Sequence, residues 1–318
     1  MASLASAPEV ETGHGRGVAA AIALDPSGSS AVLDVVLFVL LVGAAVGVLA
    51  TADAGRSPER TSVAEETADV LSTSTTHVEY TQSYTVVHER LLGSGERQRV
   101  RLRRVAGGTH AELLAAAVVA TPSIDGITLA SDDGALEREV RPVTRRALPT
   151  RAVNVQVRAV WRPYGGSPPG GALVVGDSPP RDADLSVATT AVPSGFPNAT
   201  GAAVEAAQSG RYDGVARAVA DGVIRGLFPP AGTRAALYSE GGELGAVAGR
   251  YQRVSDRLGV ETARLLERRD VHAANERLAN ALADRIREDL RREFESPTAA
   301  ARAVRIDRVR LVVRTWSP

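Results

Sequence analysis

Cysteine and lysine are both absent from this chain of 318 residues. Without cysteine the protein has no disulfide bond, no thiolate metal ligand and no cysteine nucleophile. Without lysine it has no Schiff-base lysine and no phosphate-binding P-loop lysine, and every basic side chain apart from histidine is an arginine. The 37 arginines are balanced by 37 acidic residues, so the net charge is zero. This balance removes the general electrostatic argument for nucleic acid as a partner.

Aromatic residues are also scarce, at 4% of the chain, whereas hydrophobic residues make up 44% and charged residues 23%. The last two values are ordinary for globular proteins and argue against wholesale disorder. We therefore expect a folded protein whose core is built mostly from alanine, valine and leucine.

One run near the N-terminus, residues 35–50 (VVLFVLLVGAAVGVLA), carries no charge. Extended back to Ala31, it reaches about the 20 residues that a helix needs to span a bilayer. Four interpretations stay open: a buried helix of a soluble domain, a cleaved signal peptide, a plain single-pass anchor, or a type IV pilin-like N-terminus. In the last, a short leader is removed and the apolar helix serves as both membrane anchor and assembly core.

We expect membrane attachment, and this expectation sets the domain organisation. It comprises a flexible leader or tail at 1–28, a transmembrane helix at 29–52, a linker at 53–61 and an extracytoplasmic domain at 62–318.

Asp34 lies at the edge of the apolar run, where a carboxylate has two possible roles. It can be an interfacial residue near the positive end of the helix dipole. Alternatively it is an assembly residue that pairs with the N-terminus of a neighbouring subunit, since cleavage after Gly28 or Ser29 would put it about five positions into the mature chain.

The orientation of the chain in the membrane is only weakly indicated by charge, with Arg16 before the run and Arg56 and Arg60 after it. Asn198 begins an Asn-Ala-Thr glycosylation sequon, which favours an outside location for the C-terminal domain. We therefore expect a cell-membrane protein whose C-terminal domain lies outside.

After the linker, helical and strand patterns alternate before a long helical stretch. Ser62 and Glu65 form a capping box that predicts a helix over 63–73. The remaining predicted elements are a hairpin with strands around 78–86 and 100–102, a helix at 111–120, a strand at 153–161, paired strands at 173–175 and 185–192, helices at 211–226, 243–258 and 260–294, and a final strand at 304–316. Strands on both sides of the helical run predict an α+β domain with a mainly antiparallel sheet and helices on one face.

The last predicted helix has an apolar stripe at every fourth position, which is typical of a core-facing surface. Its members are Leu278, Leu282, Ile286, Leu290 and Phe294.

No catalytic constellation is evident in the chain. The histidines show no i, i+4 pair of the kind that a helical metal site uses, no G-x-S-x-G motif is present, and the glycine-rich stretch at 93–95 lacks a P-loop ending. We therefore expect no enzymatic activity, no cofactor, no metal site and no small-molecule substrate.

Arginines alternate with other residues along three predicted strands, which places them on one face of each strand. They are Arg97, Arg99, Arg101 and Arg103 in the hairpin, Arg158 and Arg162 in the middle strand, and Arg308, Arg310 and Arg314 in the last strand. If the strands pair, one sheet face becomes rich in arginine. That face is either an ordinary solvated surface or a binding surface for acidic polymers or acidic proteins.

Three segments resemble a group of uncharacterised haloarchaeal membrane proteins: SSAVLDVVLFVLLVGAAVGVLA, AVWRPYGG and VRIDRVRLVVRTW. The resemblance covers roughly residues 29–318 and implies association with type IV pilus-like loci. It implies a pilin-like envelope protein with pilus assembly proteins or copies of itself as partners, and Asp34 is the single residue to which it gives a role. The neutral charge departs from the acidic composition usual in that group.

Overall fold

The computed structural model describes residues 62–86, 98–124, 127–128, 134–149, 153–239 and 242–317. All of them belong to one structural unit, Thr61–Pro318. The expected leader, transmembrane helix and linker lie outside the described residues. Among the helices that are described, none combines the length and apolar character needed to cross a membrane.

A six-stranded sheet forms the centre of the described part of the chain, and each of its pairings is antiparallel. Its strands in spatial order are β4 (Ile127–Thr128), β3 (Ser123–Ile124), β6 (Pro169–Gly176), β5 (Asn154–Trp161), β8 (Arg308–Trp316) and β7 (Ser186–Pro193).

The expected pairing of the strands at 173–175 and 185–192 is wrong, because β8 and β5 lie between β6 and β7. The reason lies in the last strand of the chain. Val309, Leu311 and Val313 of β8 are at most 1% exposed. Burial of this face in the core fixes the register of β8, which pairs with β5 on one side and β7 on the other.

The predicted hairpin is confirmed, but it forms a sheet of its own. β1 (Thr75–Val86) pairs with β2 (Gln98–Thr109) along their full length, from Thr75 opposite Thr109 to Val86 opposite Gln98. This two-stranded sheet does not extend the six-stranded one. The arginines of the hairpin and those of β5 and β8 therefore do not share one sheet face.

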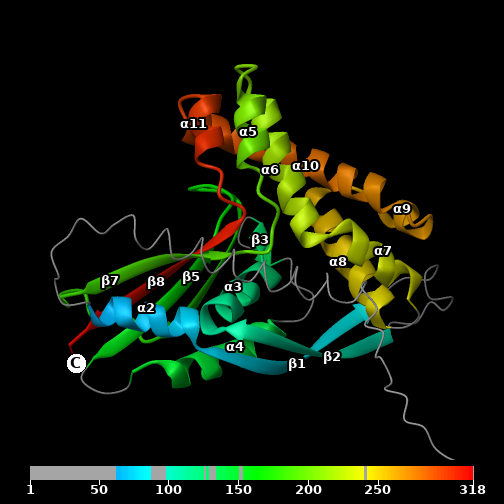
Figure 1. The fold of residues 1–318 in the computed structure, drawn as a ribbon. Helices are drawn as coiled ribbons and strands as arrows, with labels where there is room; N and C mark the ends of the chain where they lie inside the picture. Colours follow the sequence, from blue (N-terminus) through cyan, green and yellow to red (C-terminus); the bar gives the residue numbers. More distant parts are fainter. Residues whose placement is uncertain are drawn as a thin grey trace, which may run out of the picture. The chain divides into compact units, whose positions relative to one another are not determined.

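Two helices cover one face of the six-stranded sheet (Figure 1). They are α2 (Val63–Thr73) and α3 (His110–Ala120). The capping box predicted for α2 is present, since Ser62 Oγ accepts from the Glu65 N–H at 3.2 Å and the Glu65 carboxylate accepts from the Ser62 N–H at 2.9 Å. Thr109 and Glu112 form the same box at the start of α3, so both helices begin where local sequence chemistry sets them.

A third helix, α4 (Ala135–Ala147), packs against α3 and β1 and has no counterpart among the predicted elements. Pro142 lies inside it. A proline in a helix interior removes a backbone hydrogen bond, so the local sequence does not favour a helix here. Tertiary packing stabilises the helix despite this.

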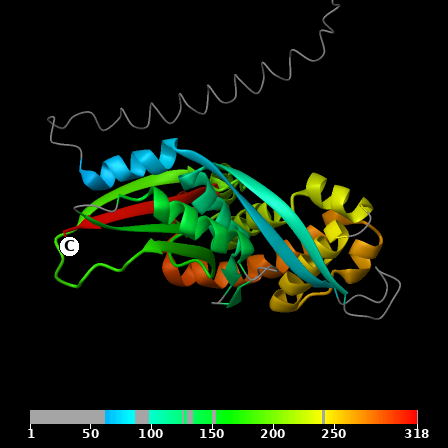
Figure 2. The same ribbon diagram turned by 90° about the horizontal axis from the view of Figure 1, so that it is seen from below.

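The remaining helices lie beyond one end of the six-stranded sheet in Figure 1. They are α5 (Thr200–Ala207), α6 (Tyr212–Leu227), α7 (Pro230–Tyr238), α8 (Gly242–Leu258), α9 (Ala263–Glu267), α10 (Val271–Glu293) and α11 (Pro297–Arg302). Figure 2 shows the hairpin extending from the α2 side toward α8. With the sheets, these helices confirm the α+β class.

The single helix predicted over 260–294 is wrong, because it is divided into α9 and α10. Arg269 adopts a left-handed conformation with φ 58°, which a continuous helix does not allow. Asp270 then caps α10 by accepting from the Ala273 N–H at 3.0 Å. The apolar stripe of α10 is confirmed from Leu278 to Leu290, whose four members are at most 1% exposed.

Candidate functional site

Strand alternation places four of the arginines on the sheet face opposite α2 and α3. Arg158 of β5 and Arg308 and Arg310 of β8 are exposed, and Arg314 of β8 is half-buried. Their apolar neighbours in sequence point to the other face and form part of the core. The grouping of Arg308, Arg310 and Arg314 on one face, expected from the sequence, is present in the structure.

The register of the sheet keeps these positive charges from facing one another directly. Arg310 lies opposite Val160 of β5 and Ala191 of β7, and Arg158 lies opposite Val312. Like charges directly opposite across strands destabilise a sheet. This arrangement concentrates cations on one face while avoiding the closest repulsive pairs.

One end of this face is hollowed. The hollow has a volume of about 440 Å³ and is lined by Arg162, Arg305, Arg308 and Arg310, with Thr189–Ala191 on one side and Tyr164 and Gly165 beside the loop that follows β5. We call it the arginine hollow. It brings together the ends of β5 and β8 with the loop between α11 and β8, so residues about 145 positions apart in the chain contribute to one site.

Positive charge in the arginine hollow is only partly compensated. The Nε atom of Arg308 lies 3.3 Å from an oxygen of Asp307. Arg305 donates to two backbone carbonyls, those of Arg302 at 2.7 Å and Val304 at 2.6 Å, and such bonds do not neutralise its charge. Neither Arg162 nor Arg310 has an ion-pair partner within the described ranges, so the hollow favours an anionic occupant.

Hydrogen bonds hold the two loops beside the arginine hollow in place. The indole N–H of Trp161 donates to the carbonyl of Ile306 at 2.9 Å, and the Arg305 N–H donates to the carbonyl of Pro163 at 2.7 Å. Tyr164 donates its hydroxyl to Asp289 at 2.9 Å. Burial, reinforced by the Asp289 charge, raises the pKa of Tyr164, so its hydroxyl stays protonated and continues to hold this loop in place.

The hairpin arginines lie elsewhere. Arg101 and Arg103 are exposed on β2, as expected, and Arg103 Nε lies 3.6 Å from a carboxylate oxygen of Glu79. Arg99 belongs to β2, but its side chain is outside the described part. Arg97 and Asp34 also fall outside the described residues, so the roles expected for them stay predictions.

Asn198 is exposed, as a glycosylation acceptor must be, but its side chain is engaged. Its amide nitrogen donates to Asp307 at 3.0 Å, and its carbonyl oxygen accepts from the Thr200 N–H at 2.8 Å. These bonds connect the start of α5 to the beginning of β8. Glycosylation of Asn198 stays a prediction, and the modification would have to replace its bond to Asp307.

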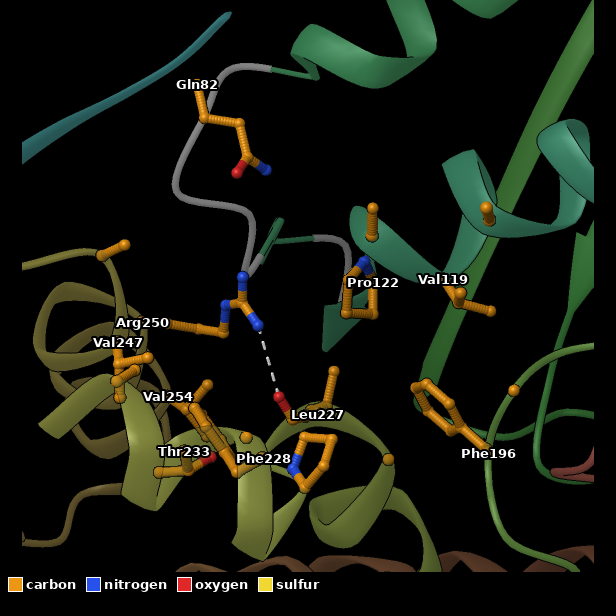
Figure 3. Close-up of a pocket in the computed structure, with 18 of the residues that line it drawn as sticks. Gln82, Val119, Pro122, Phe196, Leu227, Phe228, Thr233, Val247, Arg250 and Val254 are labelled. Atoms are coloured by element: carbon orange, nitrogen blue, oxygen red, sulfur yellow. Dashed lines mark hydrogen bonds between the residues drawn. The ribbon is translucent and has the colours of Figure 1, made fainter. Parts of the chain in front are cut away.

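A second cavity of about 500 Å³ lies between the hairpin, α3, α6, α7, α8 and the loop after β7. We call it the helical cavity. Its wall combines polar and apolar surface in similar amounts. Figure 3 shows apolar residues on two sides, with Val119, Pro122 and Phe196 on one and Val247 and Val254 on another. No sequence pattern indicated this cavity, because its lining comes in short pieces from elements far apart in the chain.

Two arginines line the helical cavity in different electrostatic states. Arg104 forms an ion pair with Glu243, in which Nη2 donates to both carboxylate oxygens at 2.7 and 2.8 Å, and its Nε donates to Gln82 at 3.0 Å. Arg250 donates a long bond of 3.4 Å from Nη1 to the carbonyl of Leu227. No carboxylate of the described ranges forms an ion pair with Arg250, so it is the uncompensated charge of this cavity.

The described residues contain no group of three or more histidine, aspartate or glutamate side chains that could hold a metal ion. His110 is buried at the start of α3, and its Nδ1 has no hydrogen-bond partner. Burial lowers the pKa of His110, so the neutral imidazole is favoured there.

A protein family described as a family of unknown function (DUF7284) matches residues 33–316, and the chain belongs to this family. Searches of curated proteins and of solved structures found no match. The family assignment therefore establishes a relationship over nearly the whole chain without assigning an activity.

Proposed function

We propose that this member of the family is a non-catalytic, membrane-anchored envelope protein of the type IV pilin-like kind. Residues 29–52 would form its transmembrane helix, and the folded part from Ser62 onward would lie outside the cell and hold partners at the membrane. The observation that carries this proposal is the charge-free run 35–50, which ends shortly before α2 begins at Val63. The partners would be the lipid bilayer and either pilus-like assembly proteins or other copies of the chain.

Membrane fractionation tests the anchor. The full chain should sediment with membranes and resist extraction with alkaline carbonate, because a spanning apolar helix is not released by disrupting charge interactions. A variant that begins at Thr61 should be soluble and folded. Full-length protein in the soluble fraction without detergent would contradict the proposal.

Asp34 tests the pilin-like part separately. Asp34→Asn should leave the protein in the membrane, since removing a charge lowers the cost of insertion. It should abolish crosslinking to neighbouring subunits, because an amide cannot replace the carboxylate that pairs with a free amino terminus. N-terminal sequencing should find a mature chain that starts at Ser29 or Ser30. A retained N-terminus with unchanged crosslinking would leave only a membrane-anchored domain.

The arginine hollow favours a second candidate, a membrane-tethered module that binds acidic polymers or acidic proteins. Two of its arginines lack ion-pair partners in the described part of the chain, and hydrogen bonds hold the loops beside it. Full-length protein in detergent should be retained on heparin, and retention should weaken as salt rises.

A matched set of variants locates that binding. Arg162→Gln and Arg310→Gln should each elute at lower salt than the unmodified chain, because each removes an uncompensated charge from the hollow. Arg225→Gln, a change of the same charge at an exposed position of α6, should elute with the unmodified chain. Equal shifts for all three variants would indicate that retention reflects total charge and not the hollow.

A further inference from the structure

We propose that the helical cavity binds a small amphipathic monocarboxylate, with the carboxylate on Arg250 and an aliphatic body against the apolar part of the wall. This inference is independent of the proposed function, since it uses neither the membrane segment nor the arginine hollow.

The size and wall of the cavity suit such a ligand. A volume of about 500 Å³ falls in the range of about 300–1,000 Å³ typical of small-molecule sites. The wall has polar and apolar parts of similar extent, as an amphipathic ligand requires. Figure 3 shows Arg250 extending from α8 toward the middle of the cavity, with Val119, Pro122 and Phe196 on the far side. A ligand held there would touch hydrocarbon on several sides and a guanidinium on one.

The charge balance limits the ligand to one negative charge. Arg104 and Glu243 neutralise each other, and their side chains are 38% and 44% exposed, which places this ion pair toward solvent. Arg250 is left with the carbonyl of Leu227 at 3.4 Å. A guanidinium forms shorter and stronger bonds to a carboxylate, at about 2.7–2.9 Å, so a carboxylate would replace a weak neutral acceptor with a better one.

The wall beside Arg250 is built to keep its shape. The rings of Phe228 and Tyr251 stack with centroids 3.9 Å apart. The Tyr251 hydroxyl donates to Asn275, whose side-chain nitrogen donates to the Phe228 carbonyl at 3.0 Å. Tyr251 and Asn275 support Phe228 from behind the lining. Among the lining residues, Arg250 is the charged group without an ion pair in the described ranges, so it would select the carboxylate.

Calorimetric titration of the full chain in lipid nanodiscs with octanoate tests the proposal, with empty nanodiscs measured as the blank. Octanoate should bind saturably with one site per chain. Octanamide has the same body without the charge, and acetate has the charge without the body. Each should bind at least about tenfold more weakly, because octanamide loses the charge-assisted hydrogen bonds to Arg250 and acetate loses the apolar contacts of the methylenes.

Two variants place the site, and a third serves as their control. Arg250→Gln should weaken octanoate binding roughly 10- to 100-fold while leaving octanamide unchanged. Gly232→Leu should block the cavity, since Gly232 lines it and a Cβ there meets no heavy atom within 4 Å. Arg234→Gln, an exposed charge on the same helix as Gly232, should bind octanoate like the unmodified chain.

Several outcomes would overturn the proposal. They are octanoate heats equal to those of empty nanodiscs, equal binding of octanoate and octanamide, and unchanged binding by the Gly232→Leu variant. Capture of an apolar peptide by a cavity that ignores octanoate would also overturn it, in favour of a protein partner.

Discussion

Leu282→Ala is the sharpest test of the fold, because Leu282 lies near the middle of the buried stripe of α10. Its side chain is 1% exposed, and α10 packs closely against α6. Replacing a buried leucine by alanine removes its transfer free energy and leaves a cavity, at a cost of about 2–5 kcal/mol. For a folded unit of this size the melting temperature should fall by roughly 4–20 °C.

The assay follows unfolding of the full chain in detergent by tryptophan fluorescence. Trp161 and Trp316 are both buried in the six-stranded sheet, so the signal reports on the folded part of the chain. Leu185→Ala is the matched control, since Leu185 is 37% exposed just before β7. It should change the free energy of unfolding by less than about 0.5 kcal/mol. Equal losses for the two leucines would refute the assignment of the buried face of α10.

Three further predictions concern stability. Tyr251→Phe should lower the free energy of unfolding by about 1–3 kcal/mol in a denaturant titration, because it leaves the buried Asn275 oxygen without its donor. Gly171→Ala should lower the free energy of unfolding by about 1–3 kcal/mol in the same assay, since its Cβ would lie 2.6 Å from a backbone carbonyl oxygen of α3. Gly201→Ala is the control, because there is open space around that position and the substitution should not destabilise the fold. Burial lowers the pKa of His110 in the folded state below its ordinary value of 6.5. As the pH falls below 6.5, the unfolded chain therefore binds a proton that the folded chain does not, and the free energy of unfolding decreases. Melting curves at several pH values should show a weaker acid dependence for His110→Gln.

Features that depend on local chemistry were predictable from the sequence. The capping box of Ser62 and Glu65 fixes the start of α2, and the alternation of valine and leucine with arginine fixes both faces of β8. In each case a few adjacent residues are enough to determine the local structure. The partner of each strand was not predictable in this way, because β6 and β7 are both short apolar segments and nothing in either shows that β5 and β8 separate them.

The division of α9 from α10 shows a different limit. The segment between them contains no glycine or proline, and its left-handed residue is Arg269. A non-glycine residue rarely adopts that conformation, so the apolar spacing alone predicts a continuous helix. The local signal for a new helix start is the N-cap Asp270, and in a chain this rich in arginine and aspartate it resembles an ordinary surface charge.

The two cavities differ in how far the sequence could indicate them, and the absence of lysine explains part of that difference. Because nearly every cation is an arginine, residue type does not separate a solvated charge from a binding one. Strand alternation could place Arg308 and Arg310 on one face, but Arg305 reaches the same hollow from a loop. In the helical cavity, Arg104 and Arg250 have the same chemistry, and only the tertiary contact with Glu243 neutralises one of them. An arginine in this protein therefore becomes a candidate binding residue when the fold removes its acidic partners, which is a property of the assembled structure and not of any segment of the chain.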